Sequence, residues 1–465
     1  MTAIALTAAY VAAAVHGTLV AGEPARAFSG VSIDTRTLRG GELFVAIKGE
    51  RFDGADFVDQ ALAAGATGVV VPRGWSATAA AERSVVIAVD DTTGALQSLA
   101  RTIRRDSGTK VVAITGSAGK TTTKEIASEF LAVRYRVIKN RGNFNNHIGL
   151  PLSLVELAQR PELAVVELGM NHAGEIATLV GIAEPDVRVW TNVGEAHLGF
   201  FASVDAIADA KAEIFEGANA STVLVANADD ARIAARLPRF RGRTITFGID
   251  RDADVRATDL VDRGIAGMRA RVTTPRGAAT LETPLVGRSN LANILAATAV
   301  AIHFDVPLDA IVDRARALRP AAHRGEVVAL PSGVTVIDDS YNANPTATRR
   351  ALDVLASASA ERRIAVLGEM LELGDHAIAL HEEVGRAAAR AKVDLLVTVG
   401  GAPAAALADA AIAAGLTRAS VRHFATSDEA ADAVAAALRH GDLALVKGSR
   451  GVRTDRIVER LKERG

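Results

Sequence analysis

Residues 111–121 join an apolar, β-branched run directly to a glycine-rich turn, and this junction constrains the fold more than any other part of the chain. The run Val-Val-Ala-Ile-Thr is typical of a buried parallel strand, and Gly116 and Gly119 permit a tight turn before a helix starting near Thr121. Such a turn lets backbone N–H groups close on phosphate oxygens at the positive end of the helix. The junction therefore predicts an α/β domain with a phosphate-binding loop and indicates a nucleoside triphosphate as its ligand.

The loop departs from the standard phosphate-loop pattern at its beginning. The standard pattern places its first glycine where this chain has Ile114, so we expect a tighter variant that begins at Gly116. Lys120 is expected to neutralise the β- and γ-phosphates, and Thr121 to bind Mg²⁺. An ordinary turn is the alternative, but it does not require this strand and helix context. The predicted nucleotide-binding residues of the loop are Gly116, Ser117, Ala118, Gly119, Lys120, Thr121 and Thr122.

Length and composition limit the classes of protein that this chain can be. Its 465 residues exceed one hydrophobic core, and we predict three domains, at residues 1–108, 109–319 and 320–465. The formal net charge is −1, so no basic face favours nucleic acid, and small charged metabolites are the expected partners. The chain has no cysteine, which excludes disulfides, thiolate metal ligands and a cysteine nucleophile, and which fits the cytoplasm.

The alanine-rich start, Ile4 to Val20, has the composition of a signal-peptide core. No lysine or arginine precedes Arg26, however, and no 18-residue stretch is free of polar residues. We therefore expect an amphipathic first helix, with neither secretion nor stable insertion into a membrane.

Strand and helix patterns alternate along all three segments. A polar stretch at 104–108 separates the small first α/β module from the second segment, whose pattern is that of a parallel sheet with antiparallel hairpins at its edge over 253–284. The third segment is more regular and predicts a doubly wound, Rossmann-like domain. The predicted strands are Leu43–Ile47, Gly68–Val71, Val85–Val89, Val111–Thr115, Ala164–Leu168, Val187–Thr191, Val223–Ala226, Val334–Ile337, Ile364–Leu367, Leu395–Val399 and Leu443–Val446.

Two polar residues follow strands of the second segment. Glu167 ends the run Ala-Val-Val-Glu, and His197 follows Trp-Thr-Asn-Val-Gly-Glu-Ala. Ligands gather at the carboxyl ends of parallel strands, where a carboxylate and an imidazole could hold Mg²⁺ against phosphates. A lone loop histidine is more often an ordinary hydrogen-bonding residue, so the phosphate loop is what favours a metal role.

Four motifs together resemble those of the Mur ligases of peptidoglycan synthesis. They are Thr-Gly-Ser-Ala-Gly-Lys-Thr at 115–121, Glu-Leu-Gly-Met-Asn at 167–171, Asn192 to His197, and Asp-Asp-Ser-Tyr-Asn-Ala-Asn-Pro at 338–345. The resemblance covers essentially the whole chain. It implies a small UDP-binding domain, a central ATPase domain with a parallel sheet, and a C-terminal Rossmann-like domain. The last motif, with residues 367–374, resembles the members that add D-alanyl-D-alanine to UDP-N-acetylmuramoyl-tripeptide, whose third residue, lysine or diaminopimelate, stays open.

The resemblance also implies a mechanism. The terminal carboxylate of the tripeptide would attack the γ-phosphate of ATP, and the amine of D-alanyl-D-alanine would then displace phosphate from the acyl phosphate, without an enzyme nucleophile. One metal is implied on Thr121 and Glu167, and another near His197 and a carbamylated lysine. The matching lysine is Lys211, which on its own would be interpreted as a solvated helix residue. The implied catalytic residues are Lys120, Glu167, His197 and Lys211.

Further positions match the binding residues of the family, although each also fits an ordinary turn or surface residue. The resemblance implies adenine contacts at Asn290 and Asn293. Two further nucleotide contacts are expected from residue type and position: Arg324 can stack on adenine or bind phosphate, and Asp339, after the strand Val334–Ile337, can accept from ribose hydroxyls. The implied contacts to the UDP-muramoyl substrate are Ser32, Asp34, Thr35, Arg36, Asn145 and Asn146. Our candidates around the D-alanyl-D-alanine pocket are Tyr341, Asn342 and Asn344, with Lys447 and Arg450, after the final strand, as candidates for binding anionic substrate there. We expect a monomer whose third domain closes on the central one to complete the ATP site.

Two other functions remain open from the sequence. A sister ligase would keep the central site but use a different amine, and would differ in the third-domain pocket. A nucleotide-gated binding module would hydrolyse ATP without forming a bond. The combination of Glu167, His197 and Lys211 exceeds what such a switch needs.

Overall fold

The computed structural model describes residues 2–76, 78 and 81–464, and its internal contacts define two compact units. The first unit comprises Met1–Ile114, Arg134–Arg188 and Glu213–Val223, and the second comprises Thr115–Val133, Val189–Ala212 and Leu224–Gly465. Each unit is assembled from segments that are distant in the sequence. The boundaries that we predicted for three sequential domains therefore stay a prediction.

The N-terminal part of the first unit is built on a five-stranded sheet in the order β1-β5-β4-β3-β2. The strand β1 is antiparallel to β5, and the other neighbours are parallel. Apolar side chains such as Phe44, Val58 and Val69 form the core beside the sheet. The elements are α1 (Ala8–Ala14), β1 (Thr18–Ala21), β2 (Val31–Ser32), β3 (Leu43–Val45), α2 (Val58–Ala63), β4 (Gly68–Pro72), β5 (Val85–Val89) and α3 (Thr92–Ser107).

The predicted helix over Ile4–Val20 is wrong in its extent. The helix α1 covers only Ala8–Ala14, because Thr7 caps its start by accepting a hydrogen bond from the backbone N–H of Tyr10, and the chain turns soon after Ala14. His16 adopts a left-handed backbone conformation, with φ at 53°, and Thr18 begins a strand. No helix among residues 2–76, 78 and 81–464 is long and apolar enough to cross a membrane.

The polar stretch at 104–108, predicted to separate the first two segments, is the end of a helix and its C-cap. It forms the last turn of α3, which ends at Gly108 with φ at 68°. The guanidinium of Arg104 donates to the backbone carbonyl of Ala183 and forms an ion pair with Asp186 at 2.7 Å. The charges in this stretch therefore hold α3 to residues 183–186 of the same unit.

The rest of the first unit contains the parallel strands β7, β8 and β6, which are neighbours in that order. Every residue of β8 is buried, as expected for a strand covered on both faces. Glu167 is its last residue. The elements are β6 (Lys110–Thr115), β7 (Val137–Lys139), α5 (Gly149–Val155), β8 (Leu163–Glu167) and α6 (Glu175–Ala183).

The second unit begins with α4, which follows the glycine-rich turn. Its strands continue in the order β9-β10-β11-β12-β13-β14, and antiparallel pairing of β12 with β13 and of β13 with β14 confirms the hairpins predicted over 253–284. The elements are α4 (Lys120–Leu131), β9 (Val187–Trp190), α7 (Val204–Ala212), β10 (Val223–Asn227), α8 (Ala231–Ala234), β11 (Arg243–Gly248), β12 (Val255–Asp262), β13 (Met268–Thr274), β14 (Gly277–Thr283), α9 (Gly287–His303) and α10 (Leu308–Arg316).

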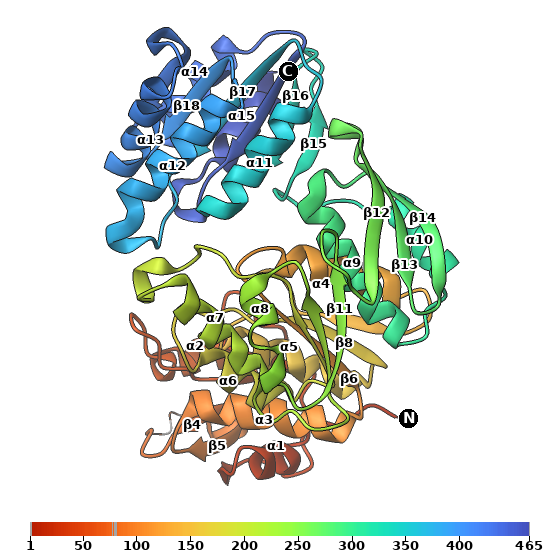
Figure 1. Ribbon diagram of the computed structural model, residues 1–465. Helices are drawn as coiled ribbons and strands as arrows, with labels where there is room; N and C mark the ends of the chain where they lie inside the picture. The colour runs from red at the N-terminus through yellow and green to blue at the C-terminus, as the bar shows by residue number, and fades with distance from the viewer. Residues whose placement is uncertain (1, 77, 79–80, 465) are drawn as a thin grey trace. The chain divides into compact units, whose positions relative to one another are not determined.

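The C-terminal part of the second unit is a six-stranded sheet in the order β15-β16-β20-β17-β18-β19, drawn in cyan and blue in Figure 1. All neighbours are parallel except β15 and β16. The elements are β15 (Glu326–Ala329), β16 (Thr335–Asp339), α11 (Pro345–Ser357), β17 (Arg362–Gly368), α12 (Ala377–Arg390), β18 (Leu395–Val399), α13 (Ala402–Ala413), β19 (Val421–Phe424), α14 (Ser427–Ala437), β20 (Asp442–Lys447) and α15 (Asp455–Arg464).

Helices cover both faces of this sheet, as the doubly wound prediction requires. On one face, Val336, Val366 and Val446 pack with side chains of α14 and α15. The alternating residues Ile337 and Leu445 are buried on the other face. The prediction missed the edge strands β15 and β19, whose residues are mostly half-exposed or exposed and therefore lack the buried apolar run that marks a central strand.

Candidate active site

The turn between β6 and α4 needs glycine at two positions. Gly116 and Gly119 have φ angles of 152° and 79°, in the region that L side chains rarely adopt. A Cβ atom would lie under 3.0 Å from the hydroxyl oxygen of Thr191 at the first position, and from the amide oxygen of Asn293 at the second. The backbone of the turn is therefore pressed against its neighbours.

Asn192 holds the backbone of this turn. Its side-chain amide oxygen accepts from the N–H of Ala118 at 2.9 Å, its amide nitrogen donates to the carbonyl of Ala118 at 2.9 Å, and its own carbonyl accepts from the N–H of Ser117. The hydroxyl of Thr191 donates to the same Ala118 carbonyl. Sequence reasoning did not assign a site role to Asn192, although it lies in a motif that carried the family resemblance.

The helix α4 presents its N-terminus at the turn, and Lys120 is its first residue. The N-cap is Gly119, which makes no side-chain cap hydrogen bond, and the positive end of the helix dipole at this turn favours an anion. The ammonium group of Lys120 donates to the carbonyl of Gly116 at 2.9 Å and thus lies across the turn. Thr121 and Thr122 follow in the first turn of the helix and are half-buried.

The two asparagines predicted to contact the nucleotide lie on α9, and Asn293 adjoins the turn. Its amide oxygen accepts from the hydroxyl of Thr123 on α4 at 3.3 Å, and its amide nitrogen donates to the amide oxygen of Asn290 at 3.5 Å. The amide nitrogen of Asn290 donates to the carbonyl of Val286. The structure therefore brings Asn293 to the glycine-rich turn, and Asn290 is linked to the turn through Asn293.

Alanine at Gly119 tests this packing. In Gly119→Ala we expect the Kd for ATP to rise about 10-fold or more, because the new methyl group displaces Asn293 and opens the turn. The matched control is Gly74→Ala, since Gly74 also has a positive φ, of 83°, and a Cβ added there would meet nothing within 4 Å. Isothermal titration should show unchanged ATP affinity in the control; equal affinity in both variants would contradict the role of the turn.

Lys211 is a fully buried lysine at the end of α7, with 1% of its surface exposed. Burial lowers the pKa of its ammonium group well below the usual value, and the positive charge of Lys120 lowers this pKa further. The interpretation of Lys211 as a solvated helix residue, made from the sequence alone, is therefore wrong. The structure therefore places a buried amine with a lowered pKa in the same unit as the glycine-rich turn.

His197 has a fixed orientation. Its backbone is left-handed, with φ at 64°, and its Nδ1 lies 2.6 Å from the carboxylate of Glu372. The hydrogen bond from His197 lowers the pKa of the Glu372 carboxyl. Glu372 is a second residue that sequence reasoning missed, because it lies 175 residues away in the chain. Its contact at Nδ1 fixes the orientation of the imidazole ring.

Glu167 and Asn145 come together within the first unit. The amide nitrogen of Asn145 donates to the carboxylate of Glu167 at 2.6 Å, and the backbone N–H of Glu167 donates to the amide oxygen of Asn140. Glu167 is 3% exposed. The structure thus links the predicted muramoyl loop to the predicted metal carboxylate.

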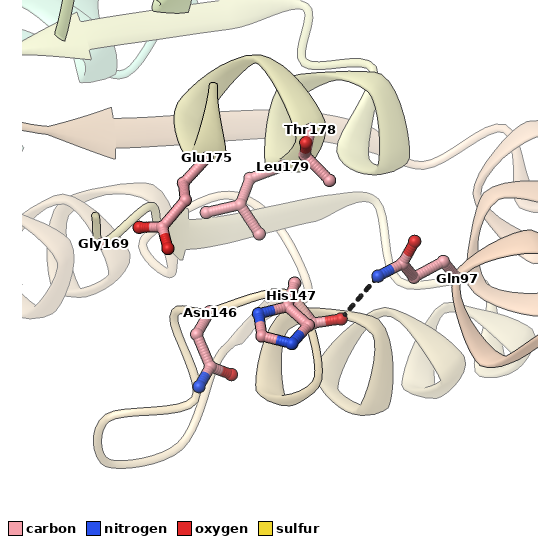
Figure 2. Close-up of a pocket in the computed structure, with 7 residues that line it drawn as sticks. All are labelled: Gln97, Asn146, His147, Gly169, Glu175, Thr178 and Leu179. Atoms are coloured by element: carbon pink, nitrogen blue, oxygen red, sulfur yellow. Dashed lines mark hydrogen bonds between the residues drawn. The ribbon is translucent and has the colours of Figure 1, made fainter. Parts of the chain in front are cut away.

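A pocket of about 210 Å³ lies beside this loop in the first unit (Figure 2). Asn146 and His147 line one side of it, Gln97 of α3 another, and the amide of Gln97 donates to the carbonyl of His147 at 3.0 Å. Glu175 at the start of α6 contributes a carboxylate. Burial raises its pKa, but hydrogen bonds from the backbone of Asn171 and His172 outweigh this effect and leave the pKa below its usual value. The pocket therefore combines amide groups with one negative charge.

The residues predicted to bind UDP form a compact turn after β2. Asp34 accepts from the guanidinium of Arg36 at 2.6 Å and from its backbone N–H, while the hydroxyl of Ser32 pairs with the backbone of Asp34. The guanidinium lowers the pKa of Asp34 to about 2. Arg36 is exposed, and Thr35 between them is half-buried. Arg36 is therefore already paired, and a bound diphosphate would compete with Asp34.

The third-segment residues also converge. The ammonium group of Lys447, only 4% exposed, donates to the carboxylate of Asp339 at 2.6 Å and to the carbonyl of Asn342 at 3.0 Å. Asn344 caps α11 by accepting from the backbone N–H of Ala347. Lys447 thus holds the segment before α11 in place.

Two arginines flank the ring of Tyr341. The guanidinium carbon of Arg324 lies 4.2 Å from the ring centroid and that of Arg450 lies 5.7 Å away. Behind them, the buried carboxylate of Asp338 accepts from the hydroxyl of Ser340 at 2.6 Å and lies 2.8 Å from Nδ1 of His323. Sequence reasoning passed over Asp338, although the doubled aspartate at the end of a strand was a usable signal.

The described residues contain no cluster of three or more histidine, cysteine, aspartate or glutamate side chains that could hold a metal ion. Mg²⁺ at nucleotide sites binds through one or two protein oxygens together with phosphates and water. A hydroxyl such as that of Thr121 and a single carboxylate such as that of Glu167 are the kind of ligands that it requires.

Comparison with known proteins gives this geometry a context. Three family models match the chain: "Mur ligase family, catalytic domain" over residues 27–104, "Mur ligase middle domain" over 114–301, and "Mur ligase, glutamate ligase domain" over 323–450. A UDP-N-acetylmuramoyl-tripeptide--D-alanyl-D-alanine ligase of Bacillus subtilis is 36% identical, covering 93% of each chain. The chain belongs to the Mur ligase family. A ligase of the same name from Escherichia coli is 34% identical to this Mur ligase, covering 94% of each chain.

Solved structures agree with the fold. A crystal structure of MurF from Acinetobacter baumannii matches this Mur ligase with a TM-score of 0.89 and 32% identity over 100% of both chains. MurF from Thermotoga maritima in complex with ADP matches with a TM-score of 0.82 and 30% identity, covering 94% of this chain and 97% of that one. The predicted fold class is confirmed: a three-domain α/β architecture with a parallel-sheet central domain and a C-terminal sheet domain.

Proposed function

We propose that this Mur ligase joins D-alanyl-D-alanine to UDP-N-acetylmuramoyl-tripeptide at the expense of ATP, in peptidoglycan synthesis. The products are UDP-N-acetylmuramoyl-pentapeptide, ADP and phosphate. The observation that carries the proposal is similarity over more than nine tenths of the chain to ligases of that name. Use of ATP is supported by the glycine-rich turn and by the ADP complex of a relative. The relatives do not favour either alternative function, the sister ligase or the binding module.

The chemistry proceeds in two substitutions. A carboxylate oxygen of the tripeptide attacks the γ-phosphorus, and ADP leaves with the electrons of the broken bond. The amine of D-alanyl-D-alanine then attacks the acyl carbon, phosphate leaves, and the amine gives up a proton. Several anionic groups meet in the first step, so Lys120 and the N-terminus of α4 lower its barrier by neutralising the phosphates. Residues 116–122 bind the nucleotide in this proposal.

Mg²⁺, when bound, would neutralise phosphate charge and orient the γ-phosphate. Thr121, Glu167, Nε2 of His197 and Lys211 are the residues that we propose as its ligands. Lys211 would act as a carbamate: its neutral amine attacks carbon dioxide, a C–N bond forms, and a proton leaves to water. The low pKa of the buried amine supports this step, since only the neutral amine has a lone pair.

We also propose the remaining contacts to the nucleotide and to the two substrates. Asn293, which adjoins the turn, its neighbour Asn290, Arg324 and Asp339 would bind the nucleoside of ATP. Tyr341, Asn342 and Asn344, with Lys447 and Arg450, would form the D-alanyl-D-alanine site, where the guanidiniums suit a terminal carboxylate. The UDP-muramoyl substrate would contact Ser32, Asp34, Thr35, Arg36, Asn145 and Asn146. The pocket in Figure 2 lies beside this last pair.

An ADP-release assay with a panel of amines tests the function. With UDP-N-acetylmuramoyl-tripeptide present, we expect turnover with D-alanyl-D-alanine and less than about a hundredth of that rate with D-alanine, L-lysine or D-glutamate, because a site built for a dipeptide leaves polar groups unpaired around a single residue. Turnover with a single amino acid but not with the dipeptide would favour a sister ligase. ADP release indifferent to the muramoyl substrate would indicate a binding module.

We also propose that the enzyme acts as a monomer. We expect it in the cytoplasm, where ATP and UDP-linked precursors are available. Size-exclusion chromatography with light scattering measures the molar mass in solution and so tests the monomeric state.

A further inference from the structure

The segment Asn192–Gly199, here called the connecting segment, contacts the nucleotide-binding turn on one side. Besides the hydrogen bonds of Asn192, the hydroxyl of Ser117 donates to the carbonyl of Gly194 at 3.1 Å, and the N–H of Gly194 donates back to that hydroxyl at 2.9 Å. Ser117 is buried. The position of the connecting segment is therefore tied to that of the glycine-rich turn.

On its other side, the connecting segment contacts the start of α11. One carboxylate oxygen of Glu195 accepts from the hydroxyl of Thr346 at 2.9 Å and from the guanidinium of Arg349 at 2.6 Å. The side chains of Glu195 and Arg349 are only 23% and 28% exposed, so water competes weakly for this pair. Thr346 also packs closely on Gly194, where an added Cβ would lie 3.1 Å from its hydroxyl.

The helix α11 begins directly after the proposed amine-binding residues. Tyr341, Asn342 and the N-cap Asn344 precede its first residue, Pro345, so a shift of this helix end moves them as well. A second contact lies nearby, since the N–H of Gly199 donates to the carbonyl of Glu372 at 2.8 Å. A carboxylate at the N-terminal end of α11 is also favoured by the helix dipole.

We propose that Glu195 is a positioning residue, which fixes the start of α11, through Thr346 and Arg349, against the segment that holds the nucleotide-binding turn. The effect is to keep the residues that bind the incoming amine at a set distance from the bound nucleotide. The amine must meet an acyl carbon formed beside the nucleotide, so this distance governs how the second substrate binds. The inference rests on the proposed function for the identity of that substrate.

The test compares Glu195→Gln with Glu383→Gln. Arg349 also pairs with the exposed Glu383 on α12 at 3.3 Å, so the second variant removes a charge from the same arginine without touching the connecting segment. In Glu195→Gln we expect the KM for D-alanyl-D-alanine to rise about 10-fold, with the Kd for ATP changed less than twofold. In Glu383→Gln we expect both constants and the Tm to stay at wild-type values. The exchanged pair Glu195→Arg with Arg349→Glu should recover part of the lost affinity.

Hydrogen exchange of peptides covering residues 340–352 gives a readout that does not need the substrate. Exchange there should be faster in Glu195→Gln than in wild type and unchanged in Glu383→Gln. Wild-type protein that fails to use D-alanyl-D-alanine would refute the proposed function, and the exchange result alone would then decide the positioning role. Unaltered exchange in Glu195→Gln, or a uniform loss of kcat and of all affinities together with a lower Tm, would overturn the inference.

Discussion

Lys120→Ala should reduce kcat about 1,000-fold or more, because no other side chain in the glycine-rich turn carries a positive charge to meet the γ-phosphate. The ammonium group lies across the turn and is bonded to the carbonyl of Gly116. In the proposed function it lies where phosphate charge would develop, so its loss would remove stabilisation from the transition state more than from the bound nucleotide. Steady-state ADP release measures the effect, with thermal unfolding to show that the variant folds.

Lys120→Arg is the matched control, since it keeps the charge but alters the shape of the donor. We expect it to retain more activity than Lys120→Ala, though less than wild type, because a planar guanidinium cannot occupy the place of a compact ammonium. Activity of Lys120→Ala above a tenth of the wild-type value would refute the assigned role. Removing this charge should also raise the pKa of Lys211, so carbamate formation should be followed in the variant by NMR with labelled bicarbonate.

Lys211→Ala should be inactive and should regain part of its activity when short carboxylic acids are added. The shortened side chain leaves a buried space in which a free carboxylate can supply the oxygen of the proposed carbamate. ADP release at increasing formate or acetate concentration measures the rescue. Full activity without added acid would exclude the carbamate, whereas an inactive variant with no rescue would show only that Lys211 matters.

Lys211→Met separates function from stability. Methionine fills a similar volume without an amine, so in bicarbonate-free buffer at pH 7 we expect this variant to be inactive but more stable than wild type by about 1 to 3 kcal/mol. The folded chain binds the proton of Lys211 less tightly than the unfolded chain, so wild-type stability rises with pH. The difference in the free energy of unfolding between Lys211→Met and wild type should therefore become smaller as the pH approaches 10.5, the ordinary lysine pKa. Chemical denaturation of both proteins between pH 7 and 10.5 measures this difference. A difference that grows with pH would contradict the prediction.

The local parts of the site could be predicted from the sequence because their residues are neighbours in the chain. The run before Gly116, the two glycines and Lys120 together specify a strand, a turn and a helix start, and the structure has each at that place. The strands Val85–Val89 and Leu395–Val399 were predicted to the residue, since a continuous apolar run in a buried strand leaves little choice.

Other parts of the fold and site could not be predicted because they depend on contacts with residues that are distant in the sequence. The polar residues at 104–108 have the composition of a segment between two domains. In the structure they form the end of α3, where Arg104 forms an ion pair with Asp186. Lys211 has the sequence context of a surface helix, and only packing decides that its amine is buried. Lys447 donates a hydrogen bond to Asp339, so an anion that binds Lys447 would compete with that carboxylate.

The sequence by itself determined the α/β class, the nucleotide-binding turn and the family to which the chain belongs, because glycine conformation, strand periodicity and short motifs are local properties. The tertiary structure decided which side chains meet: Asn192 with the turn, Glu372 with His197, Glu195 with Arg349, and the burial of Lys211. These contacts join residues up to 175 positions apart. Their energies depend on distance and on exclusion of water, and neither quantity is set until the chain has folded.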